Sequence, residues 1–219
     1  MIGEFLYEST MSRPDITFAV SILSRHISDP GLSHWEAAKR VLKYVGAHRD
    51  LRICYKKQSG NLCLEAYCDA DHGRDKETRK STTGFIVFLN GQPVHWRTCK
   101  QNCVATSTVE AEYVAASMTV KELIWIRRLV NELSQDRCED PLWLHIDNEG
   151  AENLIKHNVI NPLTKHIDIS YHFVRDWQSR GLLKTEHVIS KENVADFFTK
   201  PLERSSYEYL SNLIGIQYQ

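Results

Sequence analysis

The chain has 219 residues and a formal net charge of −1, with 42% hydrophobic and 25% charged residues. This length suffices for one substantial core and an appendage, and the composition excludes a disordered or fibrous class. Apolar runs fall well short of the roughly 20 residues that a membrane span needs, and the N-terminus lacks the basic and apolar regions of a signal peptide. We therefore expect an intracellular protein, cytoplasmic or nuclear, that does not bind membranes.

The six cysteines form no Cys-x-x-Cys pair, and three of them lie within or beside apolar stretches typical of strands. We therefore expect reduced thiols with a structural role. A net charge near zero does not exclude a nucleic-acid partner, because phosphate contacts require only locally placed Lys and Arg. Basic stretches of this kind occur at Arg97–Lys100, Arg127–Arg128 and Lys165–His166.

The first 58 residues predict a small helical segment. Apolar residues recur at helical spacing in two groups, one before the Pro30-Gly31 dipeptide and one after it. The first group is Ile16, Ala19, Val20, Leu23 and Ile27, and the second is Trp35, Ala38, Val41, Leu42 and Val45. Ser33 and Glu36 have the spacing of a capping box and predict the start of the second helix.

Residues 59–219 predict an α/β unit. Two of the expected strands are joined across Asn90-Gly91, a strong hairpin signal, and a long helix with a mostly apolar stripe follows at about Thr108–Leu133. The expected strands are Leu62–Cys68, Phe85–Leu89, Val94–Trp96, Leu142–Asp147 and Leu183–Ile189, and the later helices are Gly150–His157, Ile167–Arg180 and Asn193–Lys200. This order indicates one mixed sheet with helices packed on its faces.

Four carboxylates lie where such a fold can bring distant residues together. Asp69 and Asp147 are expected at strand ends, which is where ligands of open α/β sheets bind. Glu110 lies in the first turn of the long helix and Asp196 in the last short helix. Gathered carboxylates repel each other and need a cation, and hard oxygen ligands select Mg²⁺. A pair of such ions suits phosphodiester hydrolysis, because it stabilises both the attacking and the leaving oxygen.

Each carboxylate also has an ordinary structural explanation. An Asp after a strand is commonly a solvated turn residue, and Asp196 fits the acidic first turn of a helix. Ser107-Thr108-Val109-Glu110 is itself a capping box, in which Glu110 satisfies a backbone N–H. Spacing therefore indicates the site without establishing it.

Eight motifs in a fixed order give the sequence a specific resemblance. They are MSRPDITFAVSILSR, HWEAAKRVLKYV, YCDADHGRD, KSTTGFIVFLNGQPVHW, STVEAEYVAAS, HIDN, TKHIDISYHFVRD and HVISKENVADFFTK. Together they resemble the ribonuclease H end of copia-type retrotransposon polyproteins. The resemblance implies a ribonuclease H-like, mixed five-stranded sheet with helices on both faces over residues 59–219. It implies that residues 1–58 correspond to the connection between polymerase and nuclease.

The resemblance also implies a function, a cofactor and partners. The function is hydrolysis of the RNA strand of an RNA–DNA hybrid to 5′-phosphate and 3′-hydroxyl ends, with two Mg²⁺ ions or with Mn²⁺ as a substitute. The residues that match the catalytic, metal-binding carboxylates of the family are Asp69, Glu110, Asp147 and Asp196. Asp69 would bridge both ions, Glu110 and Asp147 would complete one site, and Asp196 would hold the ion that activates water. The expected partners are the hybrid and a reverse transcriptase domain.

Contacts to the nucleic acid are expected from polar residues near helix ends, because hybrid recognition relies on the 2′-hydroxyls and the A-like minor groove. The candidates are Lys100, Gln101, Lys165 and His166. No His lies between Ile189 and Asp196 to match the mobile histidine of cellular ribonucleases H, and Lys191 is the candidate substitute. The segment DADHGRD also departs from the family, which more often has a Trp and a small residue at the positions of His72 and Arg74.

Other interpretations are open at this point. A captured domain could keep the fold and bind nucleic acid or protein without cleavage, although the intact acidic quartet argues against this. A transposase or integrase shares the fold but carries its Glu on a late helix. A zinc site from His95, Cys99 and Cys103 has a suggestive spacing but no evident fourth ligand. The polymerase fingers and palm are missing from the motif set, so we expect an excised piece or a host gene derived from an element.

Overall fold

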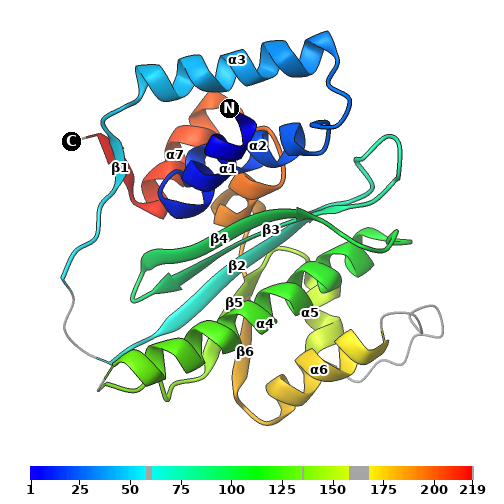
Figure 1. The fold of residues 1–219 in the computed structure, drawn as a ribbon. Helices are drawn as coiled ribbons and strands as arrows, with labels where there is room; N and C mark the ends of the chain where they lie inside the picture. Colours follow the sequence, from blue (N-terminus) through cyan, green and yellow to red (C-terminus); the bar gives the residue numbers. More distant parts are fainter. Residues whose placement is uncertain (58–60, 135, 158–167, 219) are drawn as a thin grey trace.

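The computed structural model describes residues 1–57, 61–134, 136–157 and 168–218 (Figure 1). Its centre is a five-stranded mixed sheet in the order β4-β3-β2-β5-β6. The strands are β2 (Leu64–Asp71), β3 (Thr82–Leu89), β4 (Gln92–Lys100), β5 (Leu142–Ile146) and β6 (Leu183–His187). Strand β3 runs antiparallel to both of its neighbours, β2 and β4, whereas β2, β5 and β6 are parallel. The predicted α/β fold with one mixed sheet is confirmed.

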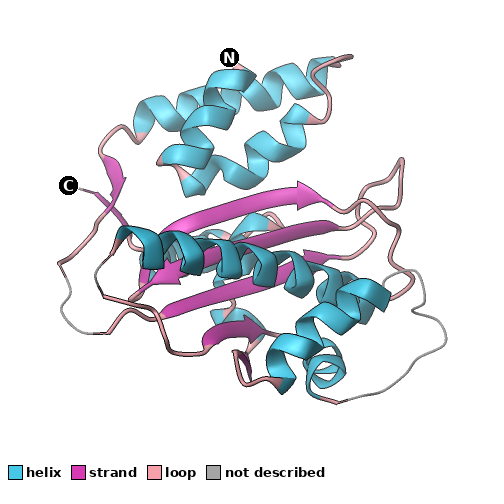
Figure 2. Ribbon diagram, turned by 60° about the horizontal axis from the view of Figure 1, so that its bottom comes forward, coloured by secondary structure: helices cyan, strands magenta, loops and turns pink. Residues whose placement is uncertain are grey.

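Helices cover both faces of this sheet (Figure 2). The α-helices are α1 (Ile2–Met11), α2 (Thr17–Ser24), α3 (Leu32–Ala47), α4 (Thr108–Leu133), α5 (Glu149–Lys156), α6 (Asp168–Ser179) and α7 (Arg204–Ile214). Short 3₁₀ turns occur at η1 (Pro14–Ile16), η3 (Ser190–Glu192) and η4 (Val194–Phe198). None of the described helices is both long enough and apolar enough to cross a bilayer.

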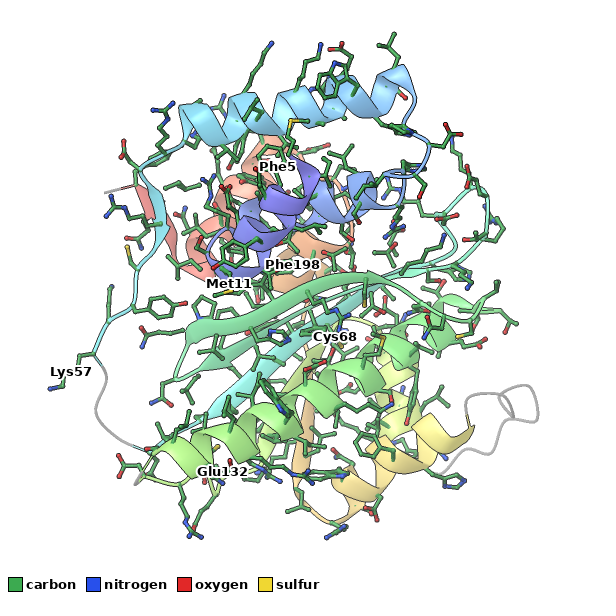
Figure 3. All side chains as sticks on the ribbon, in the orientation of Figure 1. Phe5, Met11, Lys57, Cys68, Glu132 and Phe198 are labelled. Atoms are coloured by element: carbon green, nitrogen blue, oxygen red, sulfur yellow. The ribbon has the colours of Figure 1, made fainter. Side chains whose placement is uncertain are left out.

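The sheet separates two hydrophobic clusters. Cys68 of β2 packs with residues of α4 on one side, while Phe198 of η4 packs with Ile86 and Trp96 on the other side (Figure 3). Strand β3 is buried along nearly its whole length because it is covered on both faces. The hairpin at Asn90-Gly91 is as predicted, since both residues have the positive φ (51° and 70°) that a tight β-turn of this type requires.

The N-terminal helices form a third cluster above the sheet, where Phe5, Val20 and Val41 are buried together. Two predictions about these helices were wrong. Helix α2 ends at Ser24, so Ile27 is exposed, and of the second predicted stripe Trp35 and Leu42 are exposed. Helix α3 begins at Leu32 because the Gly31 N–H donates to His34 Nδ1 at 3.0 Å, and the Ser33–Glu36 box is not its cap.

The helical segment is joined to the rest of the chain at several points. Trp96 Nε1 donates a buried hydrogen bond to the Ser9 carbonyl at 2.7 Å, and the hydroxyls of Tyr44 and Tyr207 are 2.6 Å apart. A two-stranded sheet also forms between β1 (Leu51–Ile53) and β7 (Ile216–Tyr218), next to the C-terminus. Helices α1 and α7 and this small sheet were not among the predicted elements. The domain boundary at residue 58 stays a prediction.

All six cysteines are free, as expected. The zinc interpretation is wrong, because His95 and Cys99 both lie in β4. A strand rises about 3.3 Å per residue, so residues four apart are separated by roughly 13 Å and do not share a metal ion. His95 instead faces Glu122, with Nε2 and Oε2 at 3.7 Å.

Candidate metal centre

Three of the predicted acidic residues meet near the carboxyl ends of the inner strands β2 and β5. The parallel register of β2 and β5 pairs Cys68 with Ile146, so the residues that follow, Asp69 and Asp147, lie side by side. Asp196 reaches the same point from η4. One ligand oxygen from each of the three carboxylates lies within 4.8 Å of the others. Long-range folding therefore produces the convergence that the motif positions predicted for these three residues.

The η4 turn is held against β2 and β4 by two hydrogen bonds, and a third hydrogen bond caps the turn itself. Asn193, which is fully buried, donates from Nδ2 to the Cys68 carbonyl at 3.0 Å and caps the turn by accepting from the Ala195 N–H. Thr98 Oγ1 donates to the Phe198 carbonyl at 2.7 Å. This turn was predicted as a longer helix over Asn193–Lys200, but only Val194–Phe198 is helical, and it is 3₁₀.

A glycine allows the turn to approach the sheet. Gly84 of β3 pairs with Asp69, and a Cβ at Gly84 would lie 2.6 Å from Thr199 Cγ2 and 2.8 Å from Phe198 Cβ. Any larger residue would therefore push the turn away from Asp69.

Two side chains that sequence reasoning did not select complete this region. The Thr199 hydroxyl donates a short hydrogen bond to Asp69 Oδ2, and Lys200 Nζ forms an ion pair with Asp196 Oδ1 at 2.7 Å. Both end the HVISKENVADFFTK motif, three and four residues after the predicted Asp196. Their position one helical turn after a candidate ligand, just before Pro201, is the sequence signal that could have identified them.

The structure does not place Glu110 in the role predicted for it. Glu110 Oε2 accepts from the backbone N–H and the hydroxyl of Thr106, at 2.7 and 2.6 Å, and the Glu110 N–H donates to Ser107 Oγ at 3.1 Å. These are the bonds of a helix cap, the ordinary explanation that the sequence also allowed.

Glu112 is the carboxylate of α4 that interacts electrostatically with the acidic cluster. It is 4% exposed, and the charges of Asp69 and Asp147 both act on it. An α-helix turns 100° per residue, so residues 110 and 112 point about 200° apart, and only one can face the site. Glu112 lies with Ala115, Ala116 and Thr119 on the fully covered face of α4. An acidic residue on that face is the signal that could have identified it.

Burial and mutual repulsion dominate the electrostatics of these groups. Burial, followed by the charge of Asp69, raises the pKa of Asp196 to about 7. Burial raises the pKa of Glu112 to about 9, with Asp69 and Asp147 acting in the same direction. Burial also raises the pKa of Asp69, against the opposing effects of Lys200 and the Thr199 hydroxyl. These carboxyl groups therefore ionise together only when positive charge is nearby, as the opposing effect of Lys200 on all three illustrates.

The donor set fits a hard divalent ion. Glu112 Oε2 is a buried oxygen without a hydrogen-bond partner in the described part of the chain, and the buried Asp196 Oδ1 has the Lys200 ammonium beside it at 2.7 Å. Such oxygens, together with those of Asp69 and Asp147, are the ligands that Mg²⁺ and Mn²⁺ prefer. Asp69, Asp147 and Asp196 would hold the ion, and Glu112 is close enough to influence it.

The candidate nucleic-acid contacts differ in their exposure and in their partners. Lys100 lies near the surface but pairs with Asp75, with Nζ and Oδ2 at 2.6 Å. Gln101 is 2% exposed and donates from Nε2 to Thr83 Oγ1 and to the Ala111 carbonyl, so the prediction that it contacts substrate was wrong. Its amide instead fixes the start of α4 to β3. Lys191 is exposed on η3. Lys165 and His166 lie outside the described residues.

No family model matches the chain, but curated relatives match nearly all of it. The retrovirus-related Pol polyprotein from transposon TNT 1-94 of Nicotiana tabacum is 36% identical over 215 residues, which is 98% of this chain. The corresponding polyprotein from transposon RE2 of Arabidopsis thaliana is 38% identical over 216 residues, or 99% of this chain. The chain belongs to the copia-type Pol polyproteins.

This copia-type chain spans 16% of the length of the first relative and 15% of the second. Its three antiparallel strands, long helix and two further parallel strands form the ribonuclease H-like arrangement that the resemblance implied. Among solved structures, LC11-RNase H1 in complex with an RNA/DNA hybrid is similar, with a TM-score of 0.46 and 16% identity. That match covers 62% of this chain and 93% of the other.

Proposed function

We propose that this chain is the ribonuclease H part of a copia-type Pol polyprotein and hydrolyses the RNA strand of RNA–DNA hybrids with two divalent metal ions. The observation that carries the proposal is the meeting of Asp69, Asp147 and Asp196 within 4.8 Å from three separate parts of the chain. Family membership supports it, because reverse transcription by such polyproteins produces the hybrid. The reverse transcriptase domain of the same polyprotein is the proposed partner.

The carboxylates have distinct positions in this proposal. Asp69 is 4% exposed, and Thr199 fixes the orientation of its carboxylate. Asp147 is half-buried after β5, and Asp196 is buried on η4. Glu112 approaches from α4 and replaces Glu110 as the proposed fourth acid. A bound divalent metal supplies a nucleophilic hydroxide and stabilises charge on the phosphate oxygens.

The remaining residues restrict the site. The turn that carries Asp196 is anchored by apolar packing, since Val194, Phe197 and Phe198 are buried against the sheet. Discrimination of RNA from DNA would come from contacts to 2′-hydroxyls, for which Lys100, Lys165, His166 and Lys191 stay candidates.

The test uses a hybrid whose RNA strand carries a 3′ label, incubated with the full chain and Mg²⁺. We expect cleavage of the RNA strand only, products with 5′-phosphates, and loss of cleavage with a chelator or with Asp69→Asn. The matched control is Asp176→Asn, which alters an exposed aspartate of α6 that pairs with Arg180 just after the helix. This variant should cut normally. Equal cleavage by the wild type and Asp69→Asn would refute the proposal. Binding of the hybrid without cleavage would favour a captured binding domain, and strand transfer into duplex DNA would favour an integrase.

A further inference from the structure

The acidic pocket contains its own cation. Lys200 Nζ lies 2.7 Å from Asp196 Oδ1, and the lysine side chain is 36% exposed whereas that of Asp196 is 10% exposed. The same ammonium acts on Asp69 and Glu112 as well as on Asp196. A single flexible side chain therefore offsets several buried carboxylates at once.

The backbone of Lys200 is held by a hydrogen bond, whereas its side chain is partly exposed. The Lys200 N–H donates to the Asp196 carbonyl at 3.3 Å, and Pro201 follows directly. The side chain borders a cavity of about 970 Å³ between α2, α3 and the segment after β2, which Arg74 and Phe197 also line. A lysine side chain has a flexible four-carbon stem, so displacement of the ammonium toward this space does not require the hydrogen bond between the Lys200 N–H and the Asp196 carbonyl to break.

We propose that Lys200 is the resident counter-ion of the pocket and competes with divalent metal for Asp196. The inference rests on the proposed function, because it takes the carboxylate cluster as the metal site. The atom that the ammonium occupies, Asp196 Oδ1, is also one of the buried oxygens best suited to bind a metal ion. Metal and lysine cannot both hold this oxygen closely, so metal binding displaces the ammonium. Lys200 is thus a positioning residue that sets the metal affinity through Asp196.

The chain offers a closely matched control. Lys156 and Glu152 form a second ion pair four residues apart, with Nζ and Oε1 at 2.6 Å and with the two side chains 39% and 9% exposed. This pair lies on α5 and is not part of the acidic cluster. Lys200→Met and Lys156→Met therefore remove the same charge from similar surroundings, but only the first removes a competitor of the metal.

The experiment titrates Mg²⁺, and Mn²⁺ in parallel, into the full chain by calorimetry without nucleic acid. We expect Lys200→Met to bind metal roughly tenfold more tightly than wild type, a change of about 1.4 kcal/mol. Lys200→Arg, which keeps the charge, should bind close to the wild-type value, and Lys156→Met should match wild type. In thermal unfolding, Lys200→Met should be less stable than wild type without metal and recover when metal is added, whereas Lys156→Met should not recover.

Unchanged or weaker metal binding by Lys200→Met would overturn the proposal, since weaker binding would mean that the lysine only holds Asp196 in place. Failure of both wild type and Lys200→Met to bind either metal would also overturn it. These measurements do not depend on cleavage. If metal binds with the predicted ranking but the hybrid is not cut, the proposed function fails and the role of Lys200 stands.

Discussion

The Thr199 hydroxyl donates a hydrogen bond to Asp69 Oδ2 and thereby joins residues 130 positions apart in the chain. Thr199 is fully buried, and Asp69 is 4% exposed. The bond links the last turn of the proposed site to its central strand. Partners of this kind orient metal-binding carboxylates, and their loss typically costs metal affinity or activity.

Replacing Thr199 with Val should show what the orientation of the Asp69 carboxylate contributes while the fold is kept. The shape is nearly kept, but Asp69 loses its donor, so we expect metal affinity and hybrid cleavage to fall about 10- to 100-fold. Calorimetry with Mg²⁺ and the labelled-hybrid assay measure the two effects. Thr199→Ser keeps the hydroxyl and should retain most activity. A Thr199→Val protein with normal affinity would show that the bond is incidental.

Glu112→Gln and Glu110→Gln should have opposite consequences. Glu112→Gln should abolish cleavage with little loss of stability, because a carboxyl with a pKa of about 9 is already protonated at pH 7 when no metal is bound. Glu110→Gln should leave cleavage intact and lower the free energy of unfolding by about 1 kcal/mol through weaker bonds to Thr106. Cleavage that depends on Glu110 and not on Glu112 would restore the assignment first made from the sequence.

Gly84→Ala should disturb the site through sterics. The new methyl group would meet Thr199 and Phe198 at less than van der Waals distance, and overpacking of this kind costs about 1–3 kcal/mol. We expect a lower unfolding temperature and loss of metal binding as η4 moves away from Asp69. Gly46→Ala, in α3, meets no atom within 4 Å and should instead stabilise the protein by about 0.5–1 kcal/mol. Equal behaviour of the two variants would contradict this reading of the contact.

Acid should weaken the attachment of α2 to the sheet. The Lys100 side chain and then the Thr78 backbone N–H hold the pKa of Asp75 well below its usual range, and Arg25, which directly follows α2, approaches Asp75 Oδ2 at 3.7 Å. Because the folded pKa is depressed, the stabilisation is complete above the unfolded value of about 3.9 and is lost as the pH falls through the lower folded value. Asp75→Asn should therefore lower the unfolding temperature at pH 7 and make less difference near pH 3. A constant difference across that range would exclude Asp75 as the source.

Removal of residues 1–58 tests whether the predicted boundary separates independent units. The truncated chain would lose the Trp96–Ser9 hydrogen bond, the Tyr44–Tyr207 contact and the partner of β7. It would also expose Trp96, which is 5% exposed in the full chain. We expect a clearly lower unfolding temperature and aggregation on concentration. A truncated protein as stable as the full chain would show that the helical segment is a separate appendage.

Local sequence patterns were sufficient to predict those helices and turns that depend on short-range signals. The bounds of α4 are those predicted, because its apolar residues repeat at the helical period and a capping serine precedes it. The hairpin at Asn90-Gly91 and the order of strands and helices follow from the same short-range signals. The meeting of Asp69 with Asp147 could also be anticipated, since both acids were predicted at strand ends of one sheet. The parallel pairing of β2 with β5 was added by the structure.

Contacts between distant parts of the chain settled the remainder. Which acid on α4 faces the pocket depends on how the helix rotates against β2, and a motif that contains both Glu110 and Glu112 does not fix that rotation. The burial of Gln101 and the arrival of Thr199 and Lys200 beside the acids are likewise results of long-range packing. The physical reason is that periodicity fixes which residues share a face, whereas only the assembled sheet and its covering helices decide what each face meets.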